Sequence, residues 1–111
     1  MIEKLARIVG TFMEEKITVC IVQCYPSGKI GIGHHRDKEI VPGRPILGLS
    51  LGATRVLELK RKGCDTLQLP LPSGSLYAMK GQTNNRWSHS IVKDTKVKDV
   101  RYSLTFRCVD P

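Results

Sequence analysis

The fold class is clearest in residues 101–107, which read RYSLTFR. In an extended chain, alternate residues point to the same side, so Arg101, Ser103, Thr105 and Arg107 share one face and the residues between them share the other. The apolar face predicts burial in a core. The polar face must then line either solvent or a cavity.

Short strand-like segments precede this last strand, which we expect over residues 101–109, and Gly- and Pro-containing turns such as 25–28 and 70–74 separate them. The expected strands lie at 17–24, 29–35, 46–51, 55–60, 65–69 and 75–79. Segment 17–24 is apolar and β-branched, which predicts burial on both faces. Residues 80–86 read as a polar loop, and residues 2–15 show helical spacing of apolar residues. We therefore expect a mainly β protein, a double-stranded β-helix (jelly roll) with one N-terminal α-helix.

Length and composition describe an ordinary single domain, residues 1–111, with 41% hydrophobic and 25% charged residues. The net charge of +8 is unusual and favours a polyanionic partner such as nucleic acid, although many basic proteins only carry solvated lysines. Four cysteines lack metal-binding spacing, and we expect Cys20 and Cys24 to be reduced and buried. Neither a signal peptide nor a membrane-spanning stretch is recognisable, which predicts an intracellular, cytoplasmic or nuclear location.

Residues 33–39, GHHRDKE, contain half of a metal site. The two-residue periodicity of an extended chain places His35 and Asp37 on one side and directs His34 to the other. One imidazole and one carboxylate are two-thirds of the 2-His-1-carboxylate facial triad of non-haem Fe(II) oxygenases. His89 is the one remaining histidine and thus the candidate third ligand. Alone, a His-x-Asp pattern more often belongs to an ordinary loop or strand.

The two arginines of the last strand, Arg101 and Arg107, suit a second task. Arginine grips carboxylates in a bidentate manner, so long side chains leaning inward from the strand can hold the two ends of a small dianion. The alternative is a solvated strand face, which becomes less attractive beside a metal motif.

Taken together, the ordered motifs resemble the AlkB family of Fe(II)/2-oxoglutarate-dependent dioxygenases over residues 17–107. The resemblance rests on Tyr25-Pro-x-Gly28, on His35-x-Asp37 ten residues after the tyrosine, and on segments PIxxxSLG (45–52), PxGSLxxMxG (72–81), WxHS (87–90) and RxSxTFR (101–107). The family usually has asparagine where this chain has Gln23 and Ser103.

The resemblance implies a role for each matching residue. The iron ligands would be His35, Asp37 and His89. The 2-oxoglutarate contacts would be Gln23, Tyr25, Arg101, Ser103 and Arg107, with Arg101 on the distal carboxylate and Arg107 near the iron-chelating end. The substrate contacts would be Arg36, Lys38 and Glu39, and Arg55 would support the site from an outer layer.

The implied activity is oxidative demethylation of N-alkylated bases in DNA or RNA, with release of formaldehyde, succinate and CO2. Fe(II), 2-oxoglutarate and O2 would be needed. The sequence starts close to the catalytic core, so we expect the family's N-terminal lid to be absent, or supplied by a partner protein or a missing segment, and single strands to be preferred. Three alternatives are a dioxygenase acting on a protein or small molecule, a non-enzymatic nucleic-acid-binding jelly roll, and a structural zinc protein. The last fits poorly, because an Asp ligand beside a dianion grip suits iron better.

Overall fold

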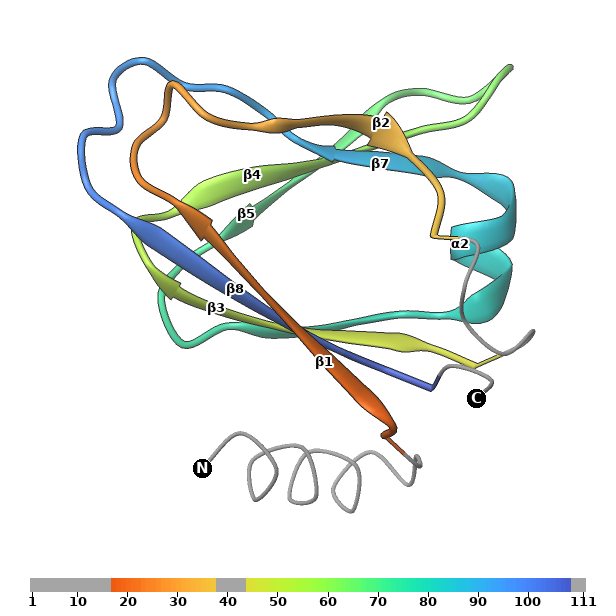
Figure 1. The fold of residues 1–111 in the computed structure, drawn as a ribbon. Coiled ribbons are helices and arrows are strands. Elements are labelled where there is room, and N and C mark those ends of the chain that lie inside the picture. The colour runs from red at the N-terminus through yellow and green to blue at the C-terminus, as the bar shows by residue number, and fades with distance from the viewer. Residues whose placement is uncertain (1–16, 38–43, 109–111) are drawn as a thin grey trace.

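The structure, a computed structural model, describes residues 17–37 and 44–108. The helix expected over residues 2–15 lies outside the described residues, as do Lys38 and Glu39. The described part contains two four-stranded sheets (Figure 1). Their strands are β1 (Val19–Tyr25), β2 (Ile32–His35), β3 (Ile46–Gly52), β4 (Arg55–Lys60), β5 (Leu67–Leu71), β6 (Leu76–Met79), β7 (Ser88–Ile91) and β8 (Arg101–Arg107).

The two sheets face each other as a sandwich. One sheet, here called the β8 sheet, has the order β1-β8-β3-β6, and the other, the β7 sheet, has the order β2-β7-β4-β5. All the strand pairs are antiparallel, and successive strands alternate between the sheets for much of the chain. This arrangement confirms the predicted jelly roll.

The sequence misjudged three segments. Residues 80–86, expected as a loop, contain a short helix, α2 (Gly81–Arg86). Strand β5 continues through Pro70 to Leu71, where we expected a turn. Proline lacks a backbone N–H donor, but β5 is an edge strand, and an edge strand tolerates that loss. Strand β7 was not predicted, because four residues with two serines and a histidine give little β-pattern.

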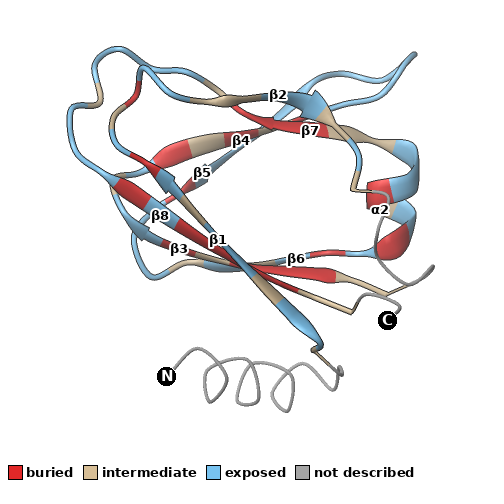
Figure 2. Ribbon diagram, viewed as in Figure 1, coloured by how far each residue is buried: buried red, intermediate tan, exposed pale blue. Residues whose placement is uncertain are grey.

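Strand β1 is also different from the expectation, since it is not buried on both faces. It lies at the edge of the β8 sheet, and Val22 is 49% exposed (Figure 2). Cys24 is exposed and Cys20 half-buried, so the prediction that both are buried was wrong, although neither forms a disulfide. β-Branched residues suit an edge strand as well as a central one, so composition alone could not separate the two.

Two apolar clusters stabilise the sandwich. The larger lies between the sheets and contains Tyr25, Ile46, Leu57, Leu59, Leu71, Met79 and Ile91. The smaller is formed by Leu47, Leu104 and Phe106 on the other face of the β8 sheet. The apolar face of β8 therefore packs into a cluster outside the sandwich, and its polar face is the one turned toward the interior.

No helix among residues 17–37 and 44–108 is long and apolar enough to cross a membrane.

Candidate metal centre and adjoining cavity

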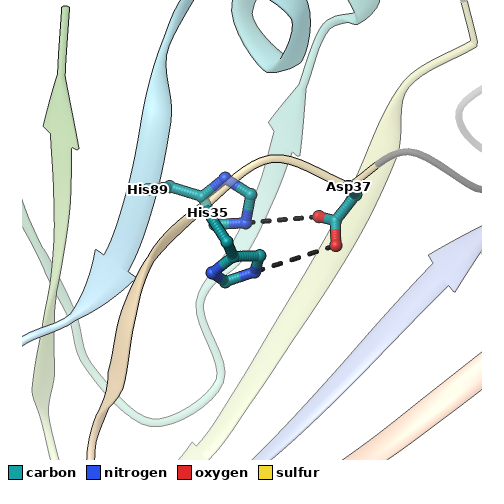
Figure 3. A group of neighbouring side chains, drawn as sticks. All are labelled: His35, Asp37 and His89. Carbon is teal, nitrogen blue, oxygen red and sulfur yellow. Dashed lines mark ion pairs between the residues drawn. The ribbon is translucent and has the colours of Figure 1, made fainter.

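Three potential metal ligands meet at one end of the sandwich. His35 and His89 come from β2 and β7, and Asp37 follows the end of β2 (Figure 3). The Nε2 atom of His89 lies 3.2 Å from Asp37 Oδ2, and the Nε2 atom of His35 lies 3.8 Å from Asp37 Oδ1. One ligand atom from each of the three residues lies within 4.8 Å of the others. The structure thus brings together the three residues that the sequence predicted as ligands.

The pairing of β2 with β7 positions the two histidines. His35 is the direct cross-strand partner of His89, so their side chains leave the sheet side by side, with ring centroids 4.3 Å apart. Ile32 is the partner of Ile91, which leaves two residues of β2 opposite one residue of β7. This β-bulge shifts the alternation of β2 so that Ile32 and His35 both face the interior.

Hydrogen bonding prepares His35 for a cation. Its Nδ1 lies 2.8 Å from the carbonyl oxygen of Gly33, which accepts a hydrogen bond from the N–H at that position. The tautomer with hydrogen on Nδ1 leaves a lone pair on Nε2, the atom directed at Asp37. A carbonyl that orients a histidine in this way is common around bound metals.

The Asp37 carboxylate is held in its charged form. Burial by itself would raise its pKa, but the neighbouring His89 and Arg107 outweigh burial and lower the pKa to about 2. Arg107 Nη1 donates a hydrogen bond of 2.9 Å to Oδ1. The other oxygen, Oδ2, is buried and accepts no hydrogen bond of good geometry from any described residue. An open carboxylate oxygen beside two imidazoles fits a divalent cation, which would complete this group.

His34 lies on the opposite face of the β7 sheet, as the alternation predicted. Its Nε2 lies 2.9 Å from Glu58 Oε1, and its Nδ1 lies 3.0 Å from the hydroxyl of Ser88. His34 is therefore separated from the metal ligands by the sheet itself.

Glu58 gives a prediction about stability. Its pKa is lowered to about 2, chiefly by hydrogen bonds from His34 and Gln68. A carboxylate with a depressed pKa stabilises the fold above its ordinary pKa, and this contribution is lost as the pH falls from about 4.5 toward 2. Glu58→Gln should thus lower the denaturation midpoint at pH 6, and the difference from the parent protein should be clearly smaller at pH 3. Urea unfolding at both pH values measures this, and a constant difference would contradict it.

A cavity of about 290 Å³ extends from the metal ligands between the sheets. It is at the lower end of the range for small-molecule sites, which is about 300–1,000 Å³. Its lining includes Gln23, Tyr25, His35, Asp37, Tyr77, His89, Ser103, Thr105 and Arg107. The polar face of β8 therefore lines a cavity, and not solvent, for most of its length.

Arg101 lies at the Tyr25 end of this cavity, behind its wall. It is 1% exposed, and its guanidinium carbon lies 5.3 Å from the centre of the Tyr25 ring. Its Nε donates a 2.8 Å hydrogen bond to the hydroxyl of the fully buried Ser50. Both Nη atoms are buried without a hydrogen-bond partner among the described residues. Buried cationic donors of this kind normally have an anionic acceptor, so this end of the cavity suits a carboxylate.

The remaining predicted residues fall in different places. Arg55 is 2% exposed and donates hydrogen bonds to the carbonyl oxygens of Ser27, Ile30 and Val92. It does not line the cavity but stacks on Tyr25, with the guanidinium carbon 5.6 Å from the ring centre. Arg36 is exposed beside the metal ligands, and Gln23 accepts a 3.4 Å hydrogen bond from the Tyr25 hydroxyl.

Asn84 is a site residue that the sequence did not reveal. This side chain of α2, 1% exposed, accepts a 3.0 Å hydrogen bond from the Asp37 N–H and donates one of 2.7 Å to the Asp37 carbonyl. Helix α2 leads into β7, the strand that carries His89. Asn84 therefore links the backbone of Asp37 to the segment next to His89. The Asn-rich composition of 80–86 looked like a loop, so nothing in the sequence marked Asn84.

We predict that Asn84→Ala weakens divalent-metal binding about 10- to 100-fold, the usual effect of losing a residue that orients a ligand. Isothermal titration with Mn(II) measures the affinity. Asn85→Ala removes the exposed neighbouring amide and is the matched control. Equal affinity in the two variants would show that Asp37 does not depend on Asn84.

Comparison with known proteins agrees with this geometry. A family model described as the 2OG-Fe(II) oxygenase superfamily matches residues 1–107. The DNA oxidative demethylase ALKBH2 of Homo sapiens is 32% identical over 118 residues, which cover 96% of this chain and 45% of that protein. The alpha-ketoglutarate-dependent dioxygenase alkB homolog 3 of Homo sapiens is 34% identical over 99 residues, covering 78% of this chain and 35% of that protein.

A solved structure, described as the structure of OsALKBH1, has the same fold. It superposes with a TM-score of 0.69 at 22% identity over 84% of this chain and 48% of that one. This chain spans less than half the length of these three relatives. Fe(II), 2-oxoglutarate and O2 are the cofactor and cosubstrates of the family whose model matches, and the relatives found are AlkB homologues. Because that model matches nearly the whole chain, the chain belongs to the AlkB-like part of the 2OG-Fe(II) oxygenase superfamily.

Proposed function

We propose that residues 1–111 form a single dioxygenase core that oxidatively demethylates N-alkylated bases in DNA or RNA, releasing formaldehyde, succinate and CO2. One observation carries the proposal: three potential ligands converge at one end of a cavity, and the buried, incompletely paired guanidinium of Arg101 lies behind the wall at its other end. The names of the relatives, DNA oxidative demethylase among them, support the choice of reaction.

His35, Asp37 and His89 would hold the iron as a facial triad, which leaves positions for the cosubstrate and O2. When bound there, the iron would supply the chemistry that oxidises an unreactive C–H bond, with 2-oxoglutarate consumed as the cosubstrate. His89 and Arg107 together keep the pKa of Asp37 low, and Arg107, because it bonds Oδ1, leaves Oδ2 available as the ligand oxygen.

2-Oxoglutarate would lie along the polar face of β8. Arg107 is next to the metal ligands and Arg101 is six positions further along the strand, roughly 20 Å away at about 3.3 Å per residue. Because both side chains are long, they can approach a five-carbon diacid from its two ends. Tyr25, Gln23 and Ser103 line the part of the cavity near Arg101 and offer further hydrogen-bonding groups. Arg55, stacked on Tyr25, would keep that ring in place.

Nucleic acid is the proposed substrate, because the chain carries a net charge of +8 and exposed cations surround the metal end. Arg36 is next to the ligands, and Lys80 and Arg86 are exposed at the two ends of α2, which contacts Asp37 through Asn84. Lys38 and Glu39 are expected to join this surface, Glu39 facing the base. A base must leave the duplex to reach such a site, and an unpaired base does so with less free energy. We therefore propose a preference for single strands, with a lid supplied by a partner protein or by a segment outside this sequence.

Two measurements test the proposal. Anaerobic addition of Fe(II) and 2-oxoglutarate should produce a visible charge-transfer absorption band that His35→Ala lacks. One methylated oligonucleotide, single-stranded or annealed, is then assayed for formaldehyde. We expect the single strand to react at least tenfold faster and the rate to fall steeply with salt, because phosphate contacts dominate binding. A band without formaldehyde from any methylated oligonucleotide would favour a protein or small-molecule substrate.

A further inference from the structure

Tyr77 lines the cavity but is an unspecified position, x, in the motif PxGSLxxMxG (72–81). It lies on β6, the edge strand of the β8 sheet, and is half-buried against the interior cluster. Its direct partner across the ladder is Gly48 of β3, and the partner of Gly48 on the other side is Thr105 of β8. Tyr77, Gly48 and Thr105 therefore form one row across the floor of the cavity.

Because Gly48 has no side chain, the ring of Tyr77 can lie over the backbone of β3. A Cβ atom built on Gly48 would overlap Cε1 and Cζ of Tyr77 and would lie 2.6 Å from its hydroxyl oxygen. The ring thus crosses over the backbone of β3, and its hydroxyl lies one strand further into the cavity than the strand that carries it. Neighbouring strands are about 4.8 Å apart, so the hydroxyl approaches the row position of Thr105.

This position is midway along the polar face of β8. Thr105 lies between Ser103 and Arg107 on that face and accepts a 3.3 Å hydrogen bond from Arg107 Nη2. Arg101 and Arg107 both act electrostatically on the Tyr77 phenol, and so does the Asp37 carboxylate. Burial nevertheless raises the pKa of Tyr77, so the phenol keeps its proton and is a hydrogen-bond donor at neutral pH.

We propose that Tyr77 is a positioning and specificity residue for the cosubstrate: its hydroxyl donates a hydrogen bond to the 2-oxo diacid, and its ring limits the length of diacid that the cavity accepts. The inference rests on the proposed function of the cavity. It assigns the discrimination between 2-oxoglutarate and longer homologues, such as 2-oxoadipate, to one aromatic ring that lies against Gly48.

The test uses the dissociation constants of 2-oxoglutarate and 2-oxoadipate, measured by titration of the Mn(II)-loaded protein without O2. Tyr77→Phe removes only the hydroxyl and should weaken 2-oxoglutarate binding about tenfold, the effect of one hydrogen bond in a water-poor site. Tyr77→Leu also removes the ring and should narrow the preference for 2-oxoglutarate over 2-oxoadipate at least fivefold. Tyr102→Phe, which alters a 44% exposed tyrosine on the other face of the sheet, should change neither constant.

The possible outcomes separate the two proposals. If the parent protein binds neither diacid, the proposed function itself fails. If it binds 2-oxoglutarate but Tyr77→Phe and Tyr77→Leu keep its affinity and its preference, the role of Tyr77 is overturned. An equal loss of affinity for both diacids in Tyr77→Leu would indicate a structural role only and would also refute selectivity. If Tyr77→Leu does not fold, Tyr77→Phe alone decides, since unchanged binding there removes the donor role.

Discussion

Replacing His35 by alanine is expected to lower the affinity for Fe(II) by more than about a hundredfold, beyond the 10- to 100-fold effect of losing an orienting neighbour. His35 is one of three potential ligands whose donor atoms converge within 4.8 Å, and its Nδ1–H is already engaged by the Gly33 carbonyl so that Nε2 is available. Anaerobic titration with Fe(II), or with Co(II) as a spectroscopic substitute, measures the affinity.

His34→Ala is the matched control for this experiment. It removes the adjacent imidazole, which contacts Glu58 and Ser88 on the other side of the β7 sheet. We expect the metal affinity of this variant to stay within about threefold of the parent protein. If both variants lose metal equally, or if His34→Ala is the more damaging, the metal is bound elsewhere than the structure indicates.

The second large effect is expected at Arg101. Arg101→Met should raise the dissociation constant of 2-oxoglutarate by at least about a hundredfold, because the proposed charge-assisted, bidentate contact to a carboxylate would be lost in a buried site. The two Nη atoms of Arg101 are buried and have no acceptor among the described residues, so the ligand carboxylate would be their partner. Titration of the metal-loaded protein, together with thermal shift on addition of 2-oxoglutarate, measures the loss.

Metal affinity distinguishes this effect from general damage to the fold. Arg101→Met should keep the Mn(II) affinity, because the metal ligands lie at the other end of the cavity. Arg61→Met, in the exposed connection between β4 and β5, removes the same charge from the surface and should leave both affinities unchanged. A change in 2-oxoglutarate binding of less than about threefold in Arg101→Met would show that this guanidinium is structural.

The choice between His34 and His35 as a metal ligand shows what could be predicted from the sequence and what could not. Residues two apart share a face, so His35 and Asp37 were predicted to point together, and they do. If the same alternation is counted from Ile32, which faces the interior, it predicts that His34 and not His35 faces the interior. The bulge between Ile32 and His35 reverses that count, and a bulge is a property of the ladder with β7, which the sequence did not predict.

The supporting residues show the same division. Ser50 on β3 orients Arg101 from β8, Asn84 on α2 fixes Asp37 after β2, and Tyr77 reaches the cavity by crossing Gly48. Each contact joins residues from different strands, or from a helix and a loop. Local patterns predict which face of a strand a residue occupies, but they carry no information about which strand becomes its neighbour.

By itself, the sequence determined the mainly β class, the ligand types and the polar face of residues 101–107, because all three follow from residue chemistry and the two-residue period of an extended chain. Tertiary structure decided that this polar face looks inward and that Leu104 and Phe106 form a second cluster outside the sandwich. The physical reason is that both faces of β8 carry buried residues, Leu104 and Phe106 on one and Ser103 and Thr105 on the other, so hydrophobicity alone does not decide which face looks inward. The arrangement of the two sheets does, because it forms a cavity on the side where His35, Asp37 and His89 can hold a metal and the arginines can hold an anion.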